Sequence, residues 1–252
     1  MLKIIRRALE NTGYQIHRLN REQIIPSEIP DPELYAGPED FSRLFRPWLG
    51  RQYDRYFTPE VVRNTMLSRK KLYLLMKLFS QAIKLHGDVL EAGTGSGGSA
   101  RLMLNCLADS KITRHMWLLD TFAGYQRVDP SKDGRHMHLN DCRCASKEEV
   151  ERLLADQAAT VRIIQGLIPD TLAQVKADKL CFAHIDVNLY EPTLTASNFV
   201  LERLVQGGII LFDDYCWPAT YGMRCAIDEV CANHQQEIIC VPESTQAFLI
   251  KN

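Results

Sequence analysis

The sequence predicts an α/β fold in which a doubly wound, mostly parallel seven-stranded sheet carries helices on both faces and follows an N-terminal helical arm. From about Asp88 onward, short apolar runs alternate with segments of helical periodicity. A glycine-rich turn, Glu91 to Ser99, closes the first run, and two later runs end in Asp186 and in Asp213-Asp214. Sheets of this kind bind ligands at the carboxyl ends of their strands. We therefore expect the functional site at that edge.

Composition favours one large core and a small ligand. Of the 252 residues, 46% are hydrophobic and 24% are charged, which suits a single globular domain and argues against disorder. The 30 basic and 31 acidic residues nearly cancel, so no positive field indicates nucleic acid as a partner. We expect a small-molecule ligand.

Cysteine usage favours a reducing compartment. The eight cysteines follow no secretory leader, so we expect reduced thiols and a cytoplasmic location. Cys142 and Cys144 form the one close pair, with His136 and His138 nearby. A zinc site is the alternative there, but the spacing of further ligands is poor, and we favour ordinary loop thiols.

The N-terminal region carries no membrane span. Residues 1–9 are basic and amphipathic but too short for a signal peptide or a spanning helix. We expect a helix that ends at Gly13 and packs on a surface or a second copy of the chain, with a membrane surface as the alternative. Residues 24–48 are rich in Pro, Gly and acidic side chains and predict a covering arm. The predicted division is 1–60 for helix and arm and 61–252 for the main domain.

The sequence pattern predicts helices and strands along the rest of the chain. A first core helix from Ser68 to Leu85 places leucines on one stripe, and Ser146 followed by Glu149 forms a capping box for a later helix. Strands are predicted at Asp88–Ala92, Met116–Asp120, Val161–Gln165, Leu180–Asp186, Gly208–Phe212, Glu237–Val241 and Gln246–Ile250. The other helices are predicted at Ser99–Leu107, Ser146–Ala158, Pro169–Ala177, Leu194–Leu204 and Tyr221–His234.

The glycine-rich turn suits a nucleotide-like cofactor, because missing side chains let the backbone approach a ligand closely. Gly93, Gly95 and Gly98 also satisfy the dinucleotide fingerprint, and Asp120 ends the next strand where a ribose-binding acid belongs. A nicotinamide-dependent oxidoreductase is therefore an alternative. Glu91 before the first glycine and the later aspartates, which hydride transfer does not require, favour S-adenosylmethionine instead.

Five segments of the sequence form a characteristic series: Glu91–Ser99, Leu118–Gly124, Gln165–Leu172, His184–Thr193 and Gly207–Tyr215. In this order they resemble the macrocin O-methyltransferase family, which uses S-adenosylmethionine and Mg²⁺ to methylate sugar hydroxyls of antibiotics. The resemblance runs from about Asn64 to Ala226 and implies a class I methyltransferase, Rossmann-like fold. Its two aspartate motifs are the most specific part.

The resemblance implies roles for individual residues. Asp186, Asp213 and Asp214 resemble the metal ligands, and Asp120 resembles the acceptor of the ribose hydroxyls. The remaining cofactor-binding positions that it implies are Thr65, Met66, Glu91, Gly93, Gly95, Ser99, Ile168 and, beside the metal, Asp186. The acceptor is then a hydroxyl of a small, glycosylated molecule.

One position departs from the family. Asn188 stands where the family usually carries an aspartate that resembles a general base, and a carboxamide cannot take up a proton at physiological pH. Candidates for that role are His136, His138 and Tyr190. The departure also leaves open a pseudoenzyme that binds the cofactor without transferring a methyl group. The polar segment 124–144 is expected to order over the acceptor.

Overall fold

The structure is a computed structural model and describes residues 47–242 and 244–252. One compact unit spans Trp48–Asn252. The predicted amphipathic helix at the N-terminus, its role in self-association and nearly all of the predicted covering arm lie outside the described residues.

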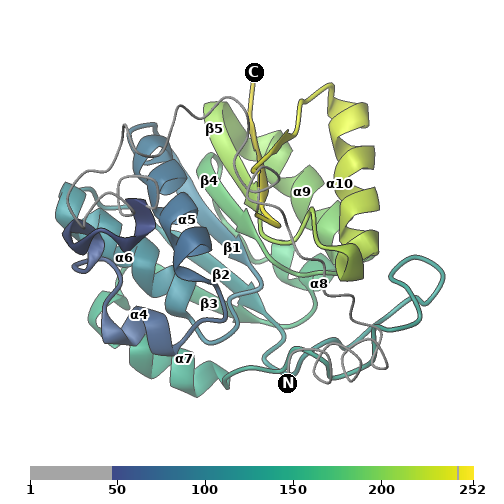
Figure 1. Cartoon of the computed structure of the whole chain (residues 1–252), viewed down its shortest axis with the longest axis horizontal. Helices are drawn as coiled ribbons and strands as arrows, with labels where there is room; N and C mark the ends of the chain where they lie inside the picture. Colours follow the sequence, from purple (N-terminus) through teal and green to yellow (C-terminus); the bar gives the residue numbers. More distant parts are fainter. Residues whose placement is uncertain (1–46, 243) are drawn as a thin grey trace, which may run out of the picture. The chain divides into compact units, whose positions relative to one another are not determined.

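A seven-stranded sheet forms the centre of this unit (Figure 1), with the strand order β3-β2-β1-β4-β5-β7-β6. Neighbouring strands from β3 to β5 pair in parallel, and β7 runs antiparallel to both of its neighbours. The sheet is therefore mostly parallel, as predicted. The strands are β1 (Asp88–Ala92), β2 (Met116–Asp120), β3 (Val161–Gln165), β4 (Leu180–Ile185), β5 (Leu204–Phe212), β6 (Ile239–Cys240) and β7 (Ala247–Ile250).

Helices cover both faces of the sheet (Figure 1). The first face carries α4 (Pro59–Arg63), α5 (Arg69–Ala82), α6 (Gly98–Ser110) and α7 (Lys147–Leu153). The second carries α8 (Ile168–Leu172), α9 (Tyr190–Arg203) and α10 (Tyr221–His234). Short 3₁₀ turns are η2 (Pro47–Leu49), η3 (Arg51–Tyr53), η4 (Ala155–Gln157) and η5 (Pro218–Thr220).

Each face has its own apolar core because side chains alternate between the two sides of a strand. On the first face, Phe79 of α5 packs edge-on against Phe182 of β4, with 5.2 Å between the ring centroids. On the second, Phe212 of β5 is fully buried in the cluster that contains Val200 of α9 and Ile227 of α10. The sheet is thus fixed from both sides.

Several predicted boundaries differ from the observed ones. Strand β5 begins at Leu204, earlier than predicted, and α9 begins at Tyr190 instead of Leu194. The predicted helix at Pro169–Ala177 ends at Leu172, because the amides of Gln174 and Val175 bond three residues back and tighten the chain. The short helix α4 is an element that the sequence did not predict.

The strand order reverses between β1 and β4, which neighbour each other while their helices α6 and α9 cover opposite faces. A crevice opens outside the strand ends at such a switch point. Within the described ranges, no helix has the length and apolar character needed to cross a bilayer.

Candidate functional site

A pocket of about 490 Å³ lies at the carboxyl ends of β1, β2, β4 and β5. Most of the site residues expected from the sequence line it, and Glu91, His136 and His138 do not. The expected residues that line it are Thr65, Met66, Gly93, Gly95, Ser99, Asp120, Ile168, Asp186, Asn188, Asp213 and Asp214.

The glycine-rich turn brings the ends of β1 and β4 close together. Gly93 has φ +88°, and a β-carbon added there would overlap the backbone carbonyl of Asp186. Two glycines further on, Gly97 adopts the left-handed conformation before α6 begins at Gly98. No side chain fits at Gly93, and residues 93–96 of the turn line the pocket just before α6 begins.

Asp120 ties the end of β2 to this turn. Its two carboxylate oxygens accept hydrogen bonds from the amides of Gly95 at 2.8 Å and Phe122 at 2.7 Å. Burial raises the pKa of Asp120 above its usual value, and these backbone donors only partly offset the effect. The carboxylate thus fixes the shape of the glycine-rich turn and still lines the pocket.

Sheet register brings the predicted aspartates together. Ile185 of β4 pairs with Phe212 of β5, so the residues that follow these partners, Asp186 and Asp213, leave the sheet side by side. With Asp214 they offer three carboxylate oxygens within 4.8 Å of one another, the only such group of potential metal ligands among the described residues. Hard oxygen donors at this spacing fit a divalent cation such as Mg²⁺.

The carboxylates of Asp186, which is half-buried, and Asp213, which is buried, respond differently to their surroundings. Burial and the neighbouring negative charge of Asp213 raise the pKa of Asp186 well above its usual value. Burial would also raise the pKa of Asp213, but contacts with His184 and Lys71 lower it below its usual value. Asp213 therefore holds its proton less tightly than an ordinary aspartic acid, and Asp186 holds its proton more tightly.

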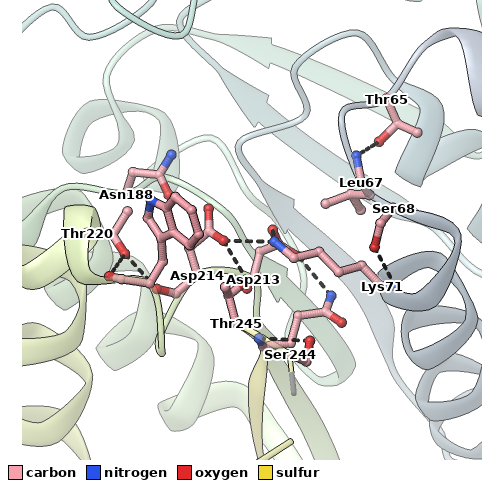
Figure 2. A network of polar contacts seen from close by, with 12 residues as sticks. Thr65, Leu67, Ser68, Lys71, Asn188, Asp213, Asp214, Thr220, Ser244 and Thr245 are labelled. Carbon is pink, nitrogen blue, oxygen red and sulfur yellow. Dashed lines mark hydrogen bonds and ion pairs between the residues drawn. The ribbon is translucent and has the colours of Figure 1, made fainter. Parts of the chain in front are cut away.

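Lys71, on the first turn of α5, reaches into the cluster (Figure 2). Its Nζ donates to Asp213 Oδ2 at 2.6 Å and to Asp214 Oδ1 at 2.8 Å. Burial alone would lower the pKa of Lys71, but the two carboxylates raise it above its ordinary value. Sequence reasoning did not assign this residue a role. The sequence did contain a signal for Lys71. Helix α5 begins with three basic residues and has no acidic residue in its first turn, although the helix dipole disfavours positive charge there.

The segment before β7 supports the same carboxylates from the other side. Gln246, which is fully buried, donates its Nε2 to Asp213 Oδ1 at 2.8 Å. Thr245 donates its hydroxyl to Asp214 Oδ1 at 2.9 Å, as Figure 2 shows. The sequence pattern did not predict these contacts. They hold the pair rigidly at the pocket wall.

Behind the pocket lies a buried ion pair. Glu91 on β1 and His184 on β4 occupy paired register positions, and His184 Nδ1 lies 2.9 Å from Glu91 Oε1. His184 Nε2 lies 4.0 Å from Asp213 Oδ1, which is too long for a hydrogen bond. Burial would lower the pKa of His184, but the two carboxylates raise it to about 10. Glu91 thus acts on the pocket through His184 and Asp213.

Asn188 lines the pocket in a left-handed conformation, with φ +61°. Its Nδ2 donates to the hydroxyl of Tyr125 at 3.0 Å, and its Oδ1 is buried without a hydrogen-bond partner. Burial and the contact with Cys142 raise the pKa of Tyr125 above its usual value. Tyr125 is therefore a neutral partner that fixes the amide of Asn188, and no sequence motif indicates this role.

Of the other candidates for a base, only Tyr190 lines the pocket. His136 is exposed and donates its Nε2 hydrogen to the carbonyl of Ala219 at 2.6 Å, and His138 is exposed outside the pocket lining. Tyr190 lines the pocket, but its hydroxyl bonds to Glu229 on α10. In the described part of the chain, these histidines do not gather with Cys142 and Cys144 into a zinc site.

The polar segment 124–144 contributes part of the pocket wall and is fastened to α9. Asp133, only 3% exposed, accepts hydrogen bonds from the amide of Tyr190 at 2.6 Å and from the amide of Asp129 at 2.8 Å. Leu189, the residue at the N-cap of α9, supplies no side-chain cap of its own. A carboxylate from a distant loop therefore caps this helix.

Comparison with known proteins gives the following relatives. The chain matches the profile described as Macrocin-O-methyltransferase (TylF) over residues 50–239. It is 32% identical over 174 residues, 63% of this chain and 65% of the relative, to 8-demethyl-8-(2,3-dimethoxy-alpha-L-rhamnosyl)-tetracenomycin-C 4'-O-methyltransferase of Streptomyces olivaceus. It is 31% identical over 184 residues, 66% of this chain and 67% of the relative, to demethyldecarbamoylnovobiocin O-methyltransferase of Streptomyces niveus. The chain thus spans about two thirds of the length of these curated relatives.

Solved structures show the same fold. The O-methyltransferase NovP superposes with a TM-score of 0.64 at 24% identity, covering 75% of this chain and 82% of that one. The calicheamicin methyltransferase CalS11 superposes with a TM-score of 0.61 at 17% identity, covering 94% of this chain and 99% of that one. The expected class I methyltransferase fold is therefore confirmed. Since the family profile spans three quarters of the sequence and matches the predicted resemblance, the chain belongs to the macrocin O-methyltransferase family.

Proposed function

We propose that the protein transfers a methyl group from S-adenosylmethionine to a hydroxyl of a small, glycosylated molecule in a reaction that requires Mg²⁺. The observation that carries this proposal is that three carboxylates, Asp186, Asp213 and Asp214, lie in the same pocket as the glycine-rich turn. Family membership favours methyl transfer over the nicotinamide-dependent alternative.

The cofactor would lie along the glycine-rich turn. Gly93, Gly95 and Ser99 leave room for its methionine part, and Asp120 is the acceptor for its ribose hydroxyls, since it lines the pocket at the end of β2. Ile168 would border the adenine. Thr65 and Met66, which line the pocket from the segment before α5, complete the set. Glu91 would support it from behind through its contact with His184.

Bound S-adenosylmethionine supplies an electrophilic methyl group, and bound Mg²⁺ makes an acceptor hydroxyl more acidic. Asp186, Asp213 and Asp214 would hold the ion, and they fit it because the cluster is partly buried and fixed by hydrogen bonds from Thr245 and Gln246. The protein's own contribution is to place the acceptor in line with the donor and to exclude water.

Asn188 orients the acceptor in this proposal and does not remove its proton. Its amide is fixed by Tyr125, and neither His136 nor His138 lines the pocket. The hydroxyl proton is therefore released to water. A protein that binds the cofactor without transfer is the second candidate, and the carboxamide at this position is the feature that favours it.

The acceptor class comes from the relatives. The relative from Streptomyces olivaceus is named for a rhamnosyl compound, and mycinamicin III 3''-O-methyltransferase of Micromonospora griseorubida, 29% identical over 174 residues, is named for mycinamicin III. We propose a glycosylated acceptor for this chain as well, no nucleic acid partner and a cytoplasmic location. Self-association through the N-terminal region is part of the same proposal.

The test is methyl transfer from labelled S-adenosylmethionine to a panel of glycosylated and phenolic acceptors, with Mg²⁺ or with a chelator. We expect transfer to a glycosylated acceptor only when Mg²⁺ is present, and none by the Asp213→Ala variant. Calorimetry should show that this variant still binds S-adenosylmethionine, and that the wild type does not bind NAD. Cofactor binding without transfer to any acceptor would favour the second candidate, and undiminished transfer with chelator would refute the metal requirement.

A further inference from the structure

Asp213 has one oxygen left for a cation. Its Oδ1 accepts a hydrogen bond from the buried Gln246 at 2.8 Å and faces His184. Its Oδ2 accepts from Lys71 Nζ at 2.6 Å, and no other donor is recorded for it in the described part of the chain. A divalent ion bound at Oδ2 of Asp213 would therefore meet the ammonium group of Lys71.

The second carboxylate binds the same ammonium group through one oxygen. Asp214 Oδ1 accepts from both Lys71 at 2.8 Å and Thr245 at 2.9 Å. The ammonium group of Lys71 thus bridges two of the three predicted ligands of the metal (Figure 2). A divalent cation held by these carboxylates would lie close to the ammonium group, and two positive charges at such short distances repel each other strongly.

The position of Lys71 on α5 is unfavourable for the helix itself. It lies in the first turn after the cap residue Ser68, where the helix dipole disfavours a positive charge. The bonds to the two carboxylates offset this. The side chain is 19% exposed and lines the pocket, so its flexible four-carbon stem can swing the ammonium group into solvent without disturbing the core.

We infer that Lys71 is an internal counter-ion of the metal-free protein, which holds Asp213 and Asp214 in place and releases them when a divalent ion binds. This inference rests on the metal requirement of the proposed function. Lys71 is accordingly a positioning residue. It keeps the carboxylates from repelling each other before the ion arrives, and it weakens the affinity for the ion because its two bonds must first be broken.

The test is calorimetric titration of the purified protein with MnCl₂ and MgCl₂. The variant Lys71→Met, which removes the charge and keeps the stem, should bind Mn²⁺ about tenfold or more tightly than the wild type. Lys71→Arg, which keeps the charge, should bind close to the wild-type value. The matched control is Lys77→Met on the same helix, whose ammonium group lies over the rings of Tyr53 and Tyr73, and its affinity should not change.

Thermal denaturation provides a second readout. With EDTA, Lys71→Met should melt below the wild type because its carboxylates have lost their counter-ion, and saturating MnCl₂ should remove most of that difference. Lys71→Gln, which keeps a hydrogen-bond donor without the charge, should behave in the same way and serves if the methionine variant does not fold.

The outcomes separate the inference from the proposed function. The inference is supported if Lys71→Met and Lys71→Gln bind Mn²⁺ more tightly than the wild type does. It is also supported if these two variants bind the ion and the wild type does not. If the wild type binds Mn²⁺ and these variants bind it equally well or more weakly, the inference is overturned and the metal requirement is left intact. If neither the wild type nor any variant binds the ion, the inference and the metal requirement are both overturned.

Discussion

The backbone carbonyl of Asp186 lies against Gly93, so that a β-carbon on this glycine would stand 2.7 Å from the carbonyl carbon of Asp186. Gly93 also has φ +88°, a conformation that other residues rarely adopt. The end of β1 therefore sets the position of the first predicted metal ligand. This contact joins the glycine-rich turn to the carboxylate cluster.

Gly93→Ala should displace Asp186 and weaken both cofactor and metal binding. We expect the variant to lose about 1–3 kcal/mol of unfolding free energy from strain, measured by urea denaturation, with additional loss from the collision. Gly207→Ala is the matched control, because Gly207 has φ +76° but its added β-carbon would meet only Leu85 at 3.6 Å. If both variants bind S-adenosylmethionine like the wild type, the contact does not shape the pocket.

Asp186→Asn should stabilise the metal-free protein and abolish metal binding. The pKa of Asp186 is higher in the folded protein than in the unfolded chain. Ionisation of Asp186 therefore lowers the stability of the protein as pH rises through the folded-state pKa. The asparagine side chain cannot ionise, so the variant does not suffer this loss. With EDTA at neutral pH we expect a gain of about 1 kcal/mol or more in unfolding free energy. Calorimetry with MnCl₂ should show no binding. Asp178→Asn, on the exposed surface, should change neither quantity, and a destabilised Asp186→Asn would contradict the prediction.

His184 should make the metal-free protein less stable at alkaline pH. Its pKa is raised from 6.5 to about 10 in the folded protein, so the folded state holds the proton more tightly. The stabilisation is complete below about pH 6.5 and is lost as pH rises toward about 10. Melting temperatures recorded with EDTA across this range should fall in the wild type. His184→Gln should show a flatter profile and a lower stability at pH 6, and an identical profile would show that the imidazole is neutral.

Asp133→Ala should release the segment 124–144 from α9. Loss of its bonds to the amides of Tyr190 and Asp129 removes a helix cap, an effect of about 1–2 kcal/mol. Limited proteolysis should then cut this segment faster, and KM for the acceptor should rise while the affinity for S-adenosylmethionine stays the same. Asp141→Ala is the control, because Asp141 accepts from the nearby amide of His138. Equal protease resistance of the two variants would show that Asp133 is not the anchor.

Much of the fold was predictable because it depends on local patterns. Strands β1, β2 and β3 begin and end at the predicted residues, since each is a short apolar run bounded by polar residues or a turn. The capping box of Ser146 and Glu149 forms as expected. The predicted end of this helix at Ala158 was wrong. Helix α7 ends at Leu153, and the chain tightens into the 3₁₀ turn η4, in which amides bond three residues back.

The contacts within the site could not be predicted in the same way. The three aspartates follow strands, and parallel strands bring such residues to one edge, so their gathering was predictable. Lys71 lies 142 positions before Asp213, and Gln246 lies 33 positions after it. Pairings over such separations depend on how α5 and β7 pack on the sheet. The sequence also did not show that Gly93 lines the pocket whereas Glu91 lies behind it.

The hydrogen bonds from Thr245 and Gln246 also bear on how the protein is made. Both residues precede the antiparallel strand β7, which joins the sheet beside β5. A nascent chain that has emerged only as far as Asp214 therefore has its carboxylates but lacks two of the donors that orient them. In the proposed function, full affinity for Mg²⁺ would therefore depend on the synthesis of Thr245 and Gln246 and on the pairing of β7 with β5.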